Sequence, residues 1–440
     1  MLFLLFTRLE GEKAEVALNL NSPYLGVSQD LALEITDLKS GVRNVQVTLA
    51  GKGKTVELLK ESVDGGDIFL GGGKRSVDFL TRIEPKKMGL AEGEAVLRIV
   101  VRDLSWRGRF HGNKTTIEKK MTIDFKPPVV TVLSRAHNVN QGGSGLVIYE
   151  LSEDCPVSGV QVGEQFFPGY TGLVEKETVF TAFFALAYSQ DTTTQIFIKA
   201  VDSAGNITRA GFPKYLKKKR FKKDKIRISD RFLESKIPEF DIPDKDFSDD
   251  PEMPPLLKKF LVINNKVRQA NAARIMKATS RTEPAILWKG KFLRMANSKR
   301  MAGFAEHRTY YYKDKKVDEQ THLGIDLAAY SRDKVTAANS GKVVFAEDLG
   351  IYGQTVILDH GFGLFSMYSH LSRIDIQVDQ VVAKDELVGL TGTTGMVGGD
   401  HLHFSMVVHN TFVNPVEWWD ATWIKNNITS KIKDVQSATP

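Results

Sequence analysis

Short runs of β-branched and aromatic residues, each closed by glycine, asparagine or aspartate, recur along most of the 440-residue chain. Between residues 13 and 125 turns separate these runs, and no apolar stripe with helical spacing interrupts them. Such runs bounded by turn residues are typical of β-strands. The pattern predicts a mainly β protein whose first domain, residues 13–126, is an immunoglobulin-like β-sandwich. The runs lie at 14–18, 31–35, 44–49, 76–80, 94–101 and 119–125.

A second series of short apolar runs begins after Pro127 and Pro128, which break the chain between the two series. Near its end, the sequence Asp-Ser-Ala-Gly-Asn at 202–206 resembles the turn that closes bacterial immunoglobulin-like repeats. We therefore predict a second immunoglobulin-like β-sandwich at residues 127–213. Its runs lie at 129–133, 145–151, 159–162, 178–186 and 195–201.

The composition changes abruptly after residue 213. A basic run with interleaved aromatic residues spans 214–223, and an acidic stretch spans 241–250. A basic run can attract nucleic acid or an anionic surface. The acidic stretch can neutralise it locally, however, and we interpret the run as a solvated strand edge or a linker. We predict a charged linker at 214–255 and no nucleic-acid partner.

Residues 256–283 show helical spacing of apolar residues, and Pro254 and Pro255 just before them suit a helix start. We predict one or two helices here, which form a helical connector between the charged linker and the C-terminal region. The last residues, 421–440, are predicted to be a C-terminal tail.

The first six residues, Met-Leu-Phe-Leu-Leu-Phe, are apolar but far fewer than the roughly 20 needed to span a bilayer. They lack the basic segment and the small-residue cleavage site of a complete signal peptide. Residues 1–12 are either the remnant of an N-terminal membrane anchor or a plain first β-strand, and the polar residues that follow at once favour the anchor. Cys155 is the only cysteine, so no intramolecular disulfide can form.

Five of the nine histidines lie between His322 and His403. His401 and His403 are two residues apart, so in an extended strand their side chains point to the same face. His322 and Asp326, four residues apart, also share a face in a strand or a helix. Two histidines and one carboxylate form the ligand set of a catalytic zinc site, which keeps a fourth position open for water. One histidine is then left over beside the metal.

The segments around these histidines are again short runs rich in β-branched and aromatic residues, without an amphipathic helix between them. They predict an antiparallel sheet with a groove between flanking loops. The glycine-rich loop 392–400 forms either one wall of that groove or simply a long hairpin connection. The runs lie at 342–347, 355–359, 364–369, 386–390 and 403–408.

The order and spacing of six motifs resemble the catalytic domain of the M23 (lysostaphin-like, LytM-type) zinc endopeptidases, which cut peptide bonds in peptidoglycan. The resemblance covers residues 284–420 and implies a compact C-terminal domain built on an antiparallel β-sheet. The motifs are Arg-Thr-Tyr-Tyr-Tyr at 308–312, His-Leu-Gly-Ile-Asp at 322–326, Ala-Asn-Ser-Gly-Lys-Val at 338–343, Tyr-Ser-His-Leu-Ser at 368–372, Gly-Leu-Thr-Gly at 389–392 and Gly-Asp-His-Leu-His-Phe at 399–404.

By this resemblance, His322, Asp326 and His403 correspond to the ligands of one Zn²⁺ per chain, and His370 and His401 correspond to two catalytic histidines. No essential position is missing, whereas degenerate members of the family have lost ligands and activate other wall enzymes. His401 shares a strand face with His403, where a general base should lie. His370 is then expected near the developing oxyanion, as a hydrogen-bond donor or as a partner that fixes the water.

The resemblance implies a zinc endopeptidase that hydrolyses the peptide cross-links of bacterial peptidoglycan and binds its peptide stems. We expect it in the periplasm, tethered to the inner membrane, with a regulatory protein partner on the immunoglobulin-like domains. Two alternatives stay open, a zinc endopeptidase acting on a protein substrate and a wall-binding regulator of other hydrolases. The complete ligand set argues against the regulator. Both D-Ala to diaminopimelate bonds and glycine bridges are within reach of the family, and the domain organisation favours the former.

The other histidines receive structural interpretations. His360 ends an apolar strand at a glycine turn and is predicted to be structural, and His409 is expected in the turn after the His-Leu-His-Phe strand. His111, His137 and His307 have no partner pattern and are expected at the surface or in loops.

We also expect the residues before about Pro284 to limit access to the groove, because an unrestrained wall hydrolase endangers its own cell. A closed state favoured by a few kcal/mol leaves only roughly 0.1 to 10% of molecules competent. The charged linker is the expected hinge.

Overall fold

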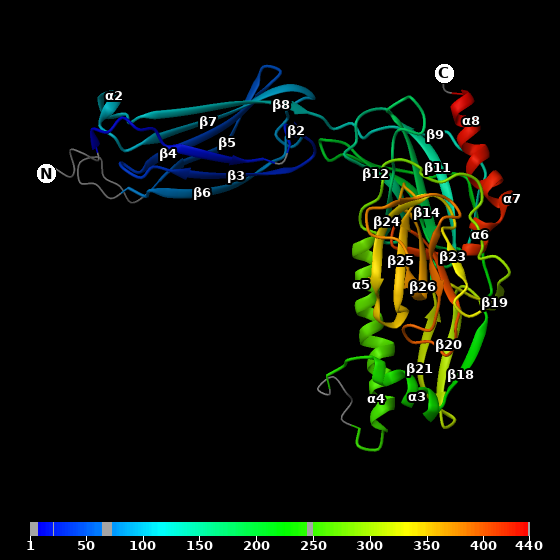
Figure 1. Cartoon of the computed structure of the whole chain (residues 1–440). Coiled ribbons are helices and arrows are strands. Elements are labelled where there is room, and N and C mark those ends of the chain that lie inside the picture. Colours follow the sequence, from blue (N-terminus) through cyan, green and yellow to red (C-terminus); the bar gives the residue numbers. More distant parts are fainter. Residues whose placement is uncertain (1–7, 21, 64–72, 244–249, 439–440) are drawn as a thin grey trace. The chain divides into compact units, whose positions relative to one another are not determined.

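The computed structural model consists mainly of β-strands, as the sequence predicts (Figure 1). Among the residues that it describes, no helix is both long and apolar enough to cross a membrane. Residues 1–7 of the predicted anchor remnant lie outside the described part of the chain, which comprises residues 8–20, 22–63, 73–243 and 250–438.

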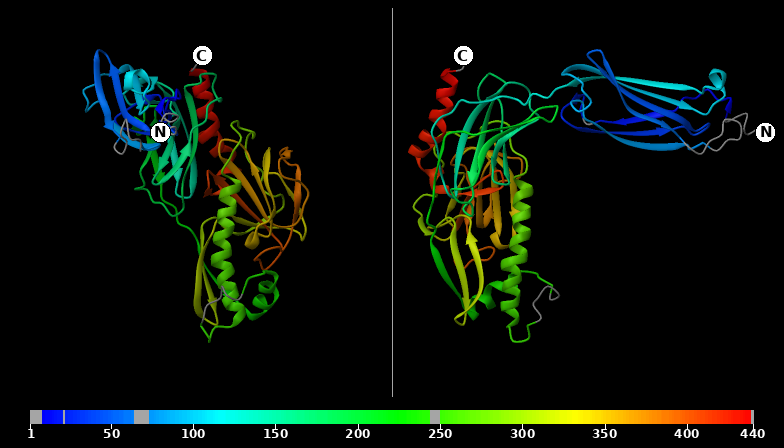
Figure 2. Two further views of the ribbon diagram at one scale, coloured as in Figure 1. Left: turned by 90° about the vertical axis from the view of Figure 1, so that its left-hand side faces the viewer. Right: turned by 180° about the vertical axis from the view of Figure 1, so that it is seen from behind.

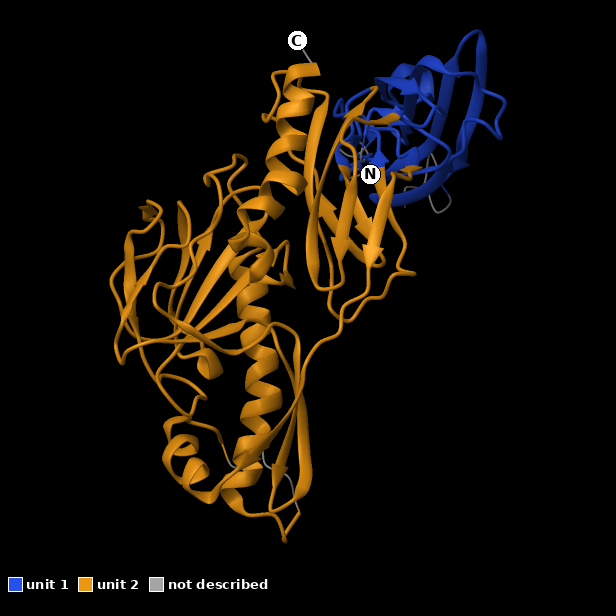
Figure 3. Cartoon of the chain, turned by 90° about the vertical axis from the view of Figure 1, so that its right-hand side faces the viewer, with its two compact units in different colours: residues 1–129, 153–157, 200–208 blue, residues 130–152, 158–199, 209–440 orange. Residues whose placement is uncertain are grey.

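The chain divides into two compact units (Figure 3). The first unit consists of residues 1–129, 153–157 and 200–208, and the second of residues 130–152, 158–199 and 209–440.

Two sheets enclose the core of the first unit. The long strands alternate buried and exposed residues, and in β7 every second side chain from Ala95 to Val101 is buried. This period of two places one face of each sheet on the shared core. The immunoglobulin-like topology stays a prediction. One sheet has the order β1 (Glu15–Asn19), β3 (Gln29–Thr36), β6 (Ser76–Ile83), and the other β2 (Tyr24–Leu25), β8 (Lys114–Ile123), β7 (Gly93–Asp103), β4 (Val42–Gly51), β5 (Lys54–Ser62).

A second pair of sheets follows in the sequence, and most of its residues belong to the second unit. Strands β11 (Gly143–Leu151) and β14 (Val179–Leu186) are buried along nearly their whole length. Continuous burial means that both faces of this sheet are covered, here because elements from the C-terminal region pack on its second face. The orders are β14, β11, β9 (Val130–Val132) in one sheet and β13 (Gln165–Pro168), β12 (Val157–Val162), β15 (Ile196–Val201), β16 (Ile207–Ala210) in the other.

The segment predicted as a charged linker contains regular structure. Strand β17 (Lys214–Lys217) pairs with β10 (His137–Asn140), and β18 (Lys223–Ile228) pairs in parallel with β20 (Glu306–Tyr312). In β18 the lysines and Arg227 lie on the exposed face, whereas Ile226 and Ile228 point inward. The charges therefore mark a half-exposed strand. Helix α3 (Asp230–Lys236) follows, its first turn capped by the Ser229 hydroxyl, and continues into η1 (Ile237–Glu239).

A helical segment occurs where the sequence predicts one. It comprises α4 (Pro255–Val262), the π-helical turn η3 (Ile263–Val267) and α5 (Arg268–Ala278). The segment runs along the C-terminal sheet (Figure 2). Its residues Leu257, Phe260 and Ile275 share one core cluster with residues of that sheet such as Phe365 and Val407. Residues before and after position 284 therefore pack into the same core.

The C-terminal sheet is antiparallel, as predicted, and has ten strands. Its main path is β19 (Lys299–Ala302), β22 (Ile325–Ala328), β29 (Leu402–Val408), β26 (Leu364–Ile374), β25 (Gln354–Asp359), β24 (Gly341–Asp348), β27 (Val381–Val382). Strand β28 (Leu387–Thr391) joins β23 (Lys334–Thr336) to β26, and β30 (Thr411–Val413) pairs with β29. A separate sheet of β18, β20 and β21 (Lys315–His322) lies beside it.

Residues 421–438, which belong to the predicted tail, are helical. The helices are α7 (Ala421–Ile424), η5 (Lys425–Thr429) and α8 (Ser430–Ala438). Ile424, Ile428 and Val435 are buried on one face, and Lys431 Nζ donates to the Leu146 carbonyl of β11 at 3.2 Å. This apolar stripe, which the sequence interpretation missed, docks the helices on the second pair of sheets.

A buried glutamate joins the same sheets to the C-terminal region. Glu417 of α6 (Pro415–Trp419) accepts from the Asn140 side chain at 2.6 Å and from the Ser144 amide at 3.0 Å. A Cβ on Gly143 would lie 2.5 Å from its carboxylate, so only glycine permits this approach. Burial raises the pKa of Glu417 to about 7.

His137 corrects one expectation. It was expected at the surface or in a loop, but it is buried in β10, where Nδ1 lies 2.8 Å from the Pro213 carbonyl oxygen and Nε2 lies 2.9 Å from Ser134 Oγ. Two polar partners and an edge contact with Phe212 compensate its burial. The sequence around Ser134 and Pro213 contains no motif that predicts these contacts with His137.

Candidate active site

Three strands bring together the residues predicted as metal ligands. His322 ends β21, Asp326 lies in β22, and His403 lies directly opposite Asp326 in the antiparallel pair of β22 and β29. Gly324 permits the turn between the first two, because a Cβ there would lie 2.4 Å from His403 Nε2. All three side chains are buried, and they meet in one cluster.

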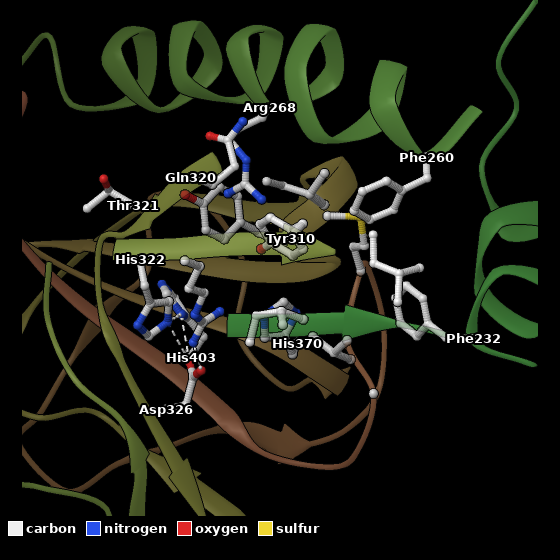
Figure 4. A pocket seen from close by; sticks show the side chains of 18 of the residues that line it. Phe232, Phe260, Arg268, Tyr310, Gln320, Thr321, His322, Asp326, His370 and His403 are labelled. Carbon is white, nitrogen blue, oxygen red and sulfur yellow. Dashed lines mark hydrogen bonds and ion pairs between the residues drawn. The ribbon is translucent and has the colours of Figure 1, made fainter. Parts of the chain in front are cut away.

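The polar atoms of this cluster are close to one another (Figure 4). His322 Nε2 lies 2.9 Å from Asp326 Oδ1, and His403 Nδ1 lies 3.0 Å from the same oxygen. The two ring nitrogens are themselves 2.9 Å apart.

The opposite ring nitrogens determine where the protons lie. His322 Nδ1 is 2.9 Å from the Gly303 carbonyl oxygen, which can only accept, so Nδ1 carries the proton. Ser405 Oγ donates to the Leu323 carbonyl and therefore accepts from His403 Nε2 at 3.0 Å. With these assignments His322 Nε2 and His403 Nδ1 carry no proton, and both direct a lone pair toward Asp326 Oδ1. Three acceptors without a proton between them fit a cation, and this donor set suits Zn²⁺.

Arg308 of β20 holds the second oxygen of Asp326. Its Nη2 donates to Asp326 Oδ2 at 3.0 Å, and its Nε lies 3.4 Å from Glu306 Oε1. Burial acts to raise the pKa of Asp326, but His322 and its other partners hold that pKa well below its usual range. The carboxylate is therefore charged at neutral pH.

The two predicted catalytic histidines lie beside this cluster. The rings of His370 and His401 are 5.0 Å apart, and that of His370 is 5.8 Å from His403. His370 Nδ1 lies 2.9 Å from the Thr394 carbonyl oxygen, and His401 Nδ1 lies 2.8 Å from that of Gly399. Both rings thus donate through Nδ1, which leaves Nε2 available. His401 Nε2 is 3.5 Å from Asp326 Oδ1.

A local distortion of β26 sets the direction of His370. The pairing with β25 shifts between Gln354 and Val356, and His370 adopts a φ of +64°, which residues other than glycine rarely adopt. A β-bulge of this kind re-aims a side chain. Burial, with smaller contributions from the neighbouring histidines, lowers the pKa of His370, so the ring is neutral near pH 7.

A cavity of about 380 Å³ opens beside the cluster (Figure 4). Met396, Val397 and Gly398 line it, so the loop 392–400 forms one wall, the first of its two predicted roles. The opposite wall comes from the segment before the catalytic sheet. The lining residues of that segment are Ile226, Arg227 and Ile228 of β18, Phe232 of α3, Phe260 of α4 and Arg268 of α5.

Residues 320–415 match the family model of peptidase family M23. The matched range contains the candidate ligands and both additional histidines. The C-terminal region of this chain is an M23 peptidase domain.

The M23 domain has relatives among characterised proteins. It is 37% identical over 95 residues to the DD-carboxypeptidase/endopeptidase Mpg of Neisseria meningitidis and 33% identical over 96 residues to the peptidoglycan DD-endopeptidase ShyA of Vibrio cholerae. Each match covers 22% of this chain and only 22% of the relative's length. Among solved structures, the catalytic domain of lysostaphin from Staphylococcus simulans is 26% identical, with a TM-score of 0.25, over 28% of this chain and 92% of that one.

Other histidines of the M23 domain have the structural positions expected of them. His360 is fully buried, with Nδ1 2.7 Å from the Ser340 carbonyl oxygen and Nε2 2.7 Å from Ser366 Oγ. His409 lies in the turn after β29, and its ring stacks on Tyr170 at 5.7 Å.

Sequence reasoning missed the residues that orient the ligands. Ser405 follows His403 by two positions in one strand, so alternation alone could have placed it on the ligand face. Gly303 and Thr394 act through backbone carbonyls, which no sequence motif reveals. Arg308 belongs to a motif that resembles the family, but its contact with Asp326 depends on how two sheets pack.

Proposed function

We propose that this protein is a zinc-dependent endopeptidase that hydrolyses the peptide cross-links of bacterial peptidoglycan. The M23 domain and the names of the relatives support the peptidase class and this substrate. A location in the bacterial cell envelope follows from such a substrate. The observation that carries the zinc dependence is the convergence of His322 Nε2, His403 Nδ1 and Asp326 Oδ1 within 3.0 Å of one another.

These three atoms would hold the zinc ion. Gly303 and Ser405 fix the two imidazole rings in the tautomers that ligation requires, and Arg308 fixes the carboxylate. When bound there, zinc would lower the pKa of a water molecule toward roughly 7 and polarise the scissile carbonyl.

Two further histidines would handle the proton. We assign proton acceptance from the attacking water to His401 Nε2, because this atom lies beside the ligand oxygen of Asp326. The same atom then returns the proton to the leaving amine. His370 Nε2, which carries no proton in the neutral ring, accepts a hydrogen bond from the attacking water and orients it. The carbonyls of Gly399 and Thr394 keep both rings in place.

Digestion of purified cross-linked muropeptides by the full chain tests the proposal. Mass spectrometry of the products identifies the bond cut, and cleavage at the D-Ala to diaminopimelate bond is expected. Activity should disappear on chelation and return with zinc. A folded, zinc-loaded chain that leaves muropeptides intact but cuts a denatured protein would refute the substrate, and cleavage that survives complete metal removal would refute the chemistry.

A further inference from the structure

The helical segment before the catalytic sheet places a cation in the wall of the active-site cavity. Arg268 is the first residue of α5, directly after the π-helical turn η3, and it lines the same cavity as the candidate ligands. Figure 4 shows its side chain reaching from the helix into the space above the histidines. A π-turn adds a residue to the helix and so changes the direction of the side chains that follow.

A buried asparagine holds the guanidinium group. Arg268 Nε donates to the Asn264 backbone carbonyl at 3.1 Å, and Nη2 donates to Asn264 Oδ1 at 2.6 Å. Asn264 is fully buried and is fixed in turn by Asp318 Oδ2 at 2.6 Å. A guanidinium has five N–H donors, so these contacts leave donors for a ligand. These contacts fix the orientation of the Arg268 guanidinium before a ligand binds.

Arg268 also approaches the catalytic cluster through a tyrosine. Tyr352 lies near Arg268, and the tyrosine ring lies 5.5 Å from the ring of His403. The guanidinium is therefore separated from a candidate ligand by a single side chain.

The charges in the cavity wall do not balance. Of its three arginines, Arg308 pairs with Asp326, and the exposed Arg227 lies 3.8 Å from Asp314. Among the described residues, no carboxylate lies within ion-pairing distance of Arg268. A partly buried cation without a counter-charge costs free energy that an incoming anion would offset.

Much of the rest of the cavity wall is apolar, with Phe232, Phe260, Tyr310 and Val397 among its residues. The volume of about 380 Å³ falls within the usual range of ligand pockets. A ligand that matches both the Arg268 cation and the apolar wall carries a carboxylate attached to an apolar group, as an amino-acid residue of a peptide does.

We infer that this cavity is a substrate subsite in which Arg268 binds a free carboxylate of the peptide, next to the bond that is cut. The inference rests on the proposed function and specifies its substrate class as acidic peptides. Arg268 is here a residue that determines specificity, because a planar guanidinium can bind a carboxylate through two hydrogen bonds. The carboxylate belongs either to the C-terminus of the peptide or to a side chain.

Kinetics of Arg268→Gln in the zinc-loaded full chain test this subsite. Three cross-linked peptides are compared, one with all carboxylates free, one amidated at the C-terminus and one amidated at the side chain beside the bond. We expect Arg268→Gln to raise KM for the free peptide about 10-fold or more with little change in kcat, since a charge-assisted contact common to ground and transition states is lost. The amidated peptide that already lacks the relevant carboxylate should be unaffected, which identifies its source.

Arg274→Gln is the matched control, because Arg274 lies on the same helix but pairs with Glu347 outside the cavity. It should keep the KM of the parent. Arg268→Lys keeps the positive charge but loses the planar guanidinium, so it should raise KM less than Arg268→Gln does. An equal loss on free and amidated peptides would mean that Arg268 only holds the wall in place, and a higher rate on all of them would mean that Arg268 keeps the cavity closed and does not bind the peptide. Both results overturn the inference.

Binding of the cleavage products separates this inference from the proposed function. Calorimetry of the zinc-loaded chain should show a product with a free carboxylate binding about 10-fold more tightly than its amide, and Arg268→Gln should abolish the difference. If the parent chain cuts none of the peptides but keeps this difference, the proposed function fails while the carboxylate site stands. If the parent chain cuts the peptides but binds the free and the amidated product equally, the carboxylate site is refuted and the proposed function stands.

Discussion

Arg308 Nη2 donates to Asp326 Oδ2 at 3.0 Å, while Asp326 Oδ1 faces both His322 and His403. One carboxylate thus joins the candidate ligands to a cation from a neighbouring sheet. Arg308→Gln should weaken zinc binding by roughly 10- to 100-fold, because the carboxylate loses its fixed orientation. A competition titration with a chromogenic chelator measures this. Arg227→Gln, at an exposed site on β18, should keep the parent affinity, and an unchanged affinity in Arg308→Gln would contradict the orienting role.

Alanine at His322, Asp326 or His403 should remove both the metal and the activity, because each supplies one of three converging acceptors. Elemental analysis of the purified full-length variants gives the zinc content per chain. His307→Ala is a suitable control, since His307 lies on the nearby strand β20 with a half-exposed side chain. Full zinc occupancy in His403→Ala would refute the ligand assignment.

His370→Ala and His401→Ala should retain zinc and yet lower turnover by roughly 100-fold or more, the scale of general acid–base and oxyanion contributions. Turnover on muropeptides and zinc content are measured on the same samples. Parental turnover in either variant would show that its histidine has no catalytic role.

The pH dependence of stability should report on Glu417. Its pKa is about 7 in the folded chain and 4.5 as the ordinary value, so the folded state binds more protons between these limits. Stability therefore falls as the pH rises from about 4.5 to about 7, and this one group contributes a loss of about 3 kcal/mol. Denaturant unfolding at pH 5 and pH 8 should show a smaller loss in Glu417→Gln than in the parent. Equal losses in the two proteins would contradict this prediction.

Control of access by upstream residues stays a prediction, and the structure changes how it can be tested. A fragment starting at Pro284 would lack Leu257, Phe260 and Ile275, which share a core with the catalytic sheet. The test therefore needs the full chain. Phe232→Ala, which removes a ring from the cavity wall, should speed cleavage of cross-linked muropeptides more than cleavage of short peptides. Equal effects on both substrates would argue against a steric restraint.

The sequence sufficed to predict which candidate site residues lie together. His403 lies in β29 and His401 lies two residues before it in an isolated bridge to Gly392, and the motif resemblance added His322, Asp326 and His370. Contacts that depend on the packing of distant segments were out of reach. These include Arg308 on Asp326 and Arg268 in the cavity wall, because no short-range pattern encodes which sheet or helix lies opposite.

Charge also obscured secondary structure. In β18 the lysines occupy one face and the isoleucines the other, so a strand was interpreted as part of a linker. From α7 to α8, a few buried residues at helical spacing were outnumbered by polar ones. In both cases one covered face is enough to order a segment that is mostly polar.

The core shared by the helical segment and the C-terminal sheet bears on how the M23 domain could be transferred to another protein. A chimaera that borrows only the residues matching the family model would expose the apolar surface that Phe260 and its neighbours now cover. It would also leave the Glu417 carboxylate without Asn140 and Ser144. A portable module that contains the M23 domain therefore starts no later than β9, and it is more than twice as long as the range that matches the family model.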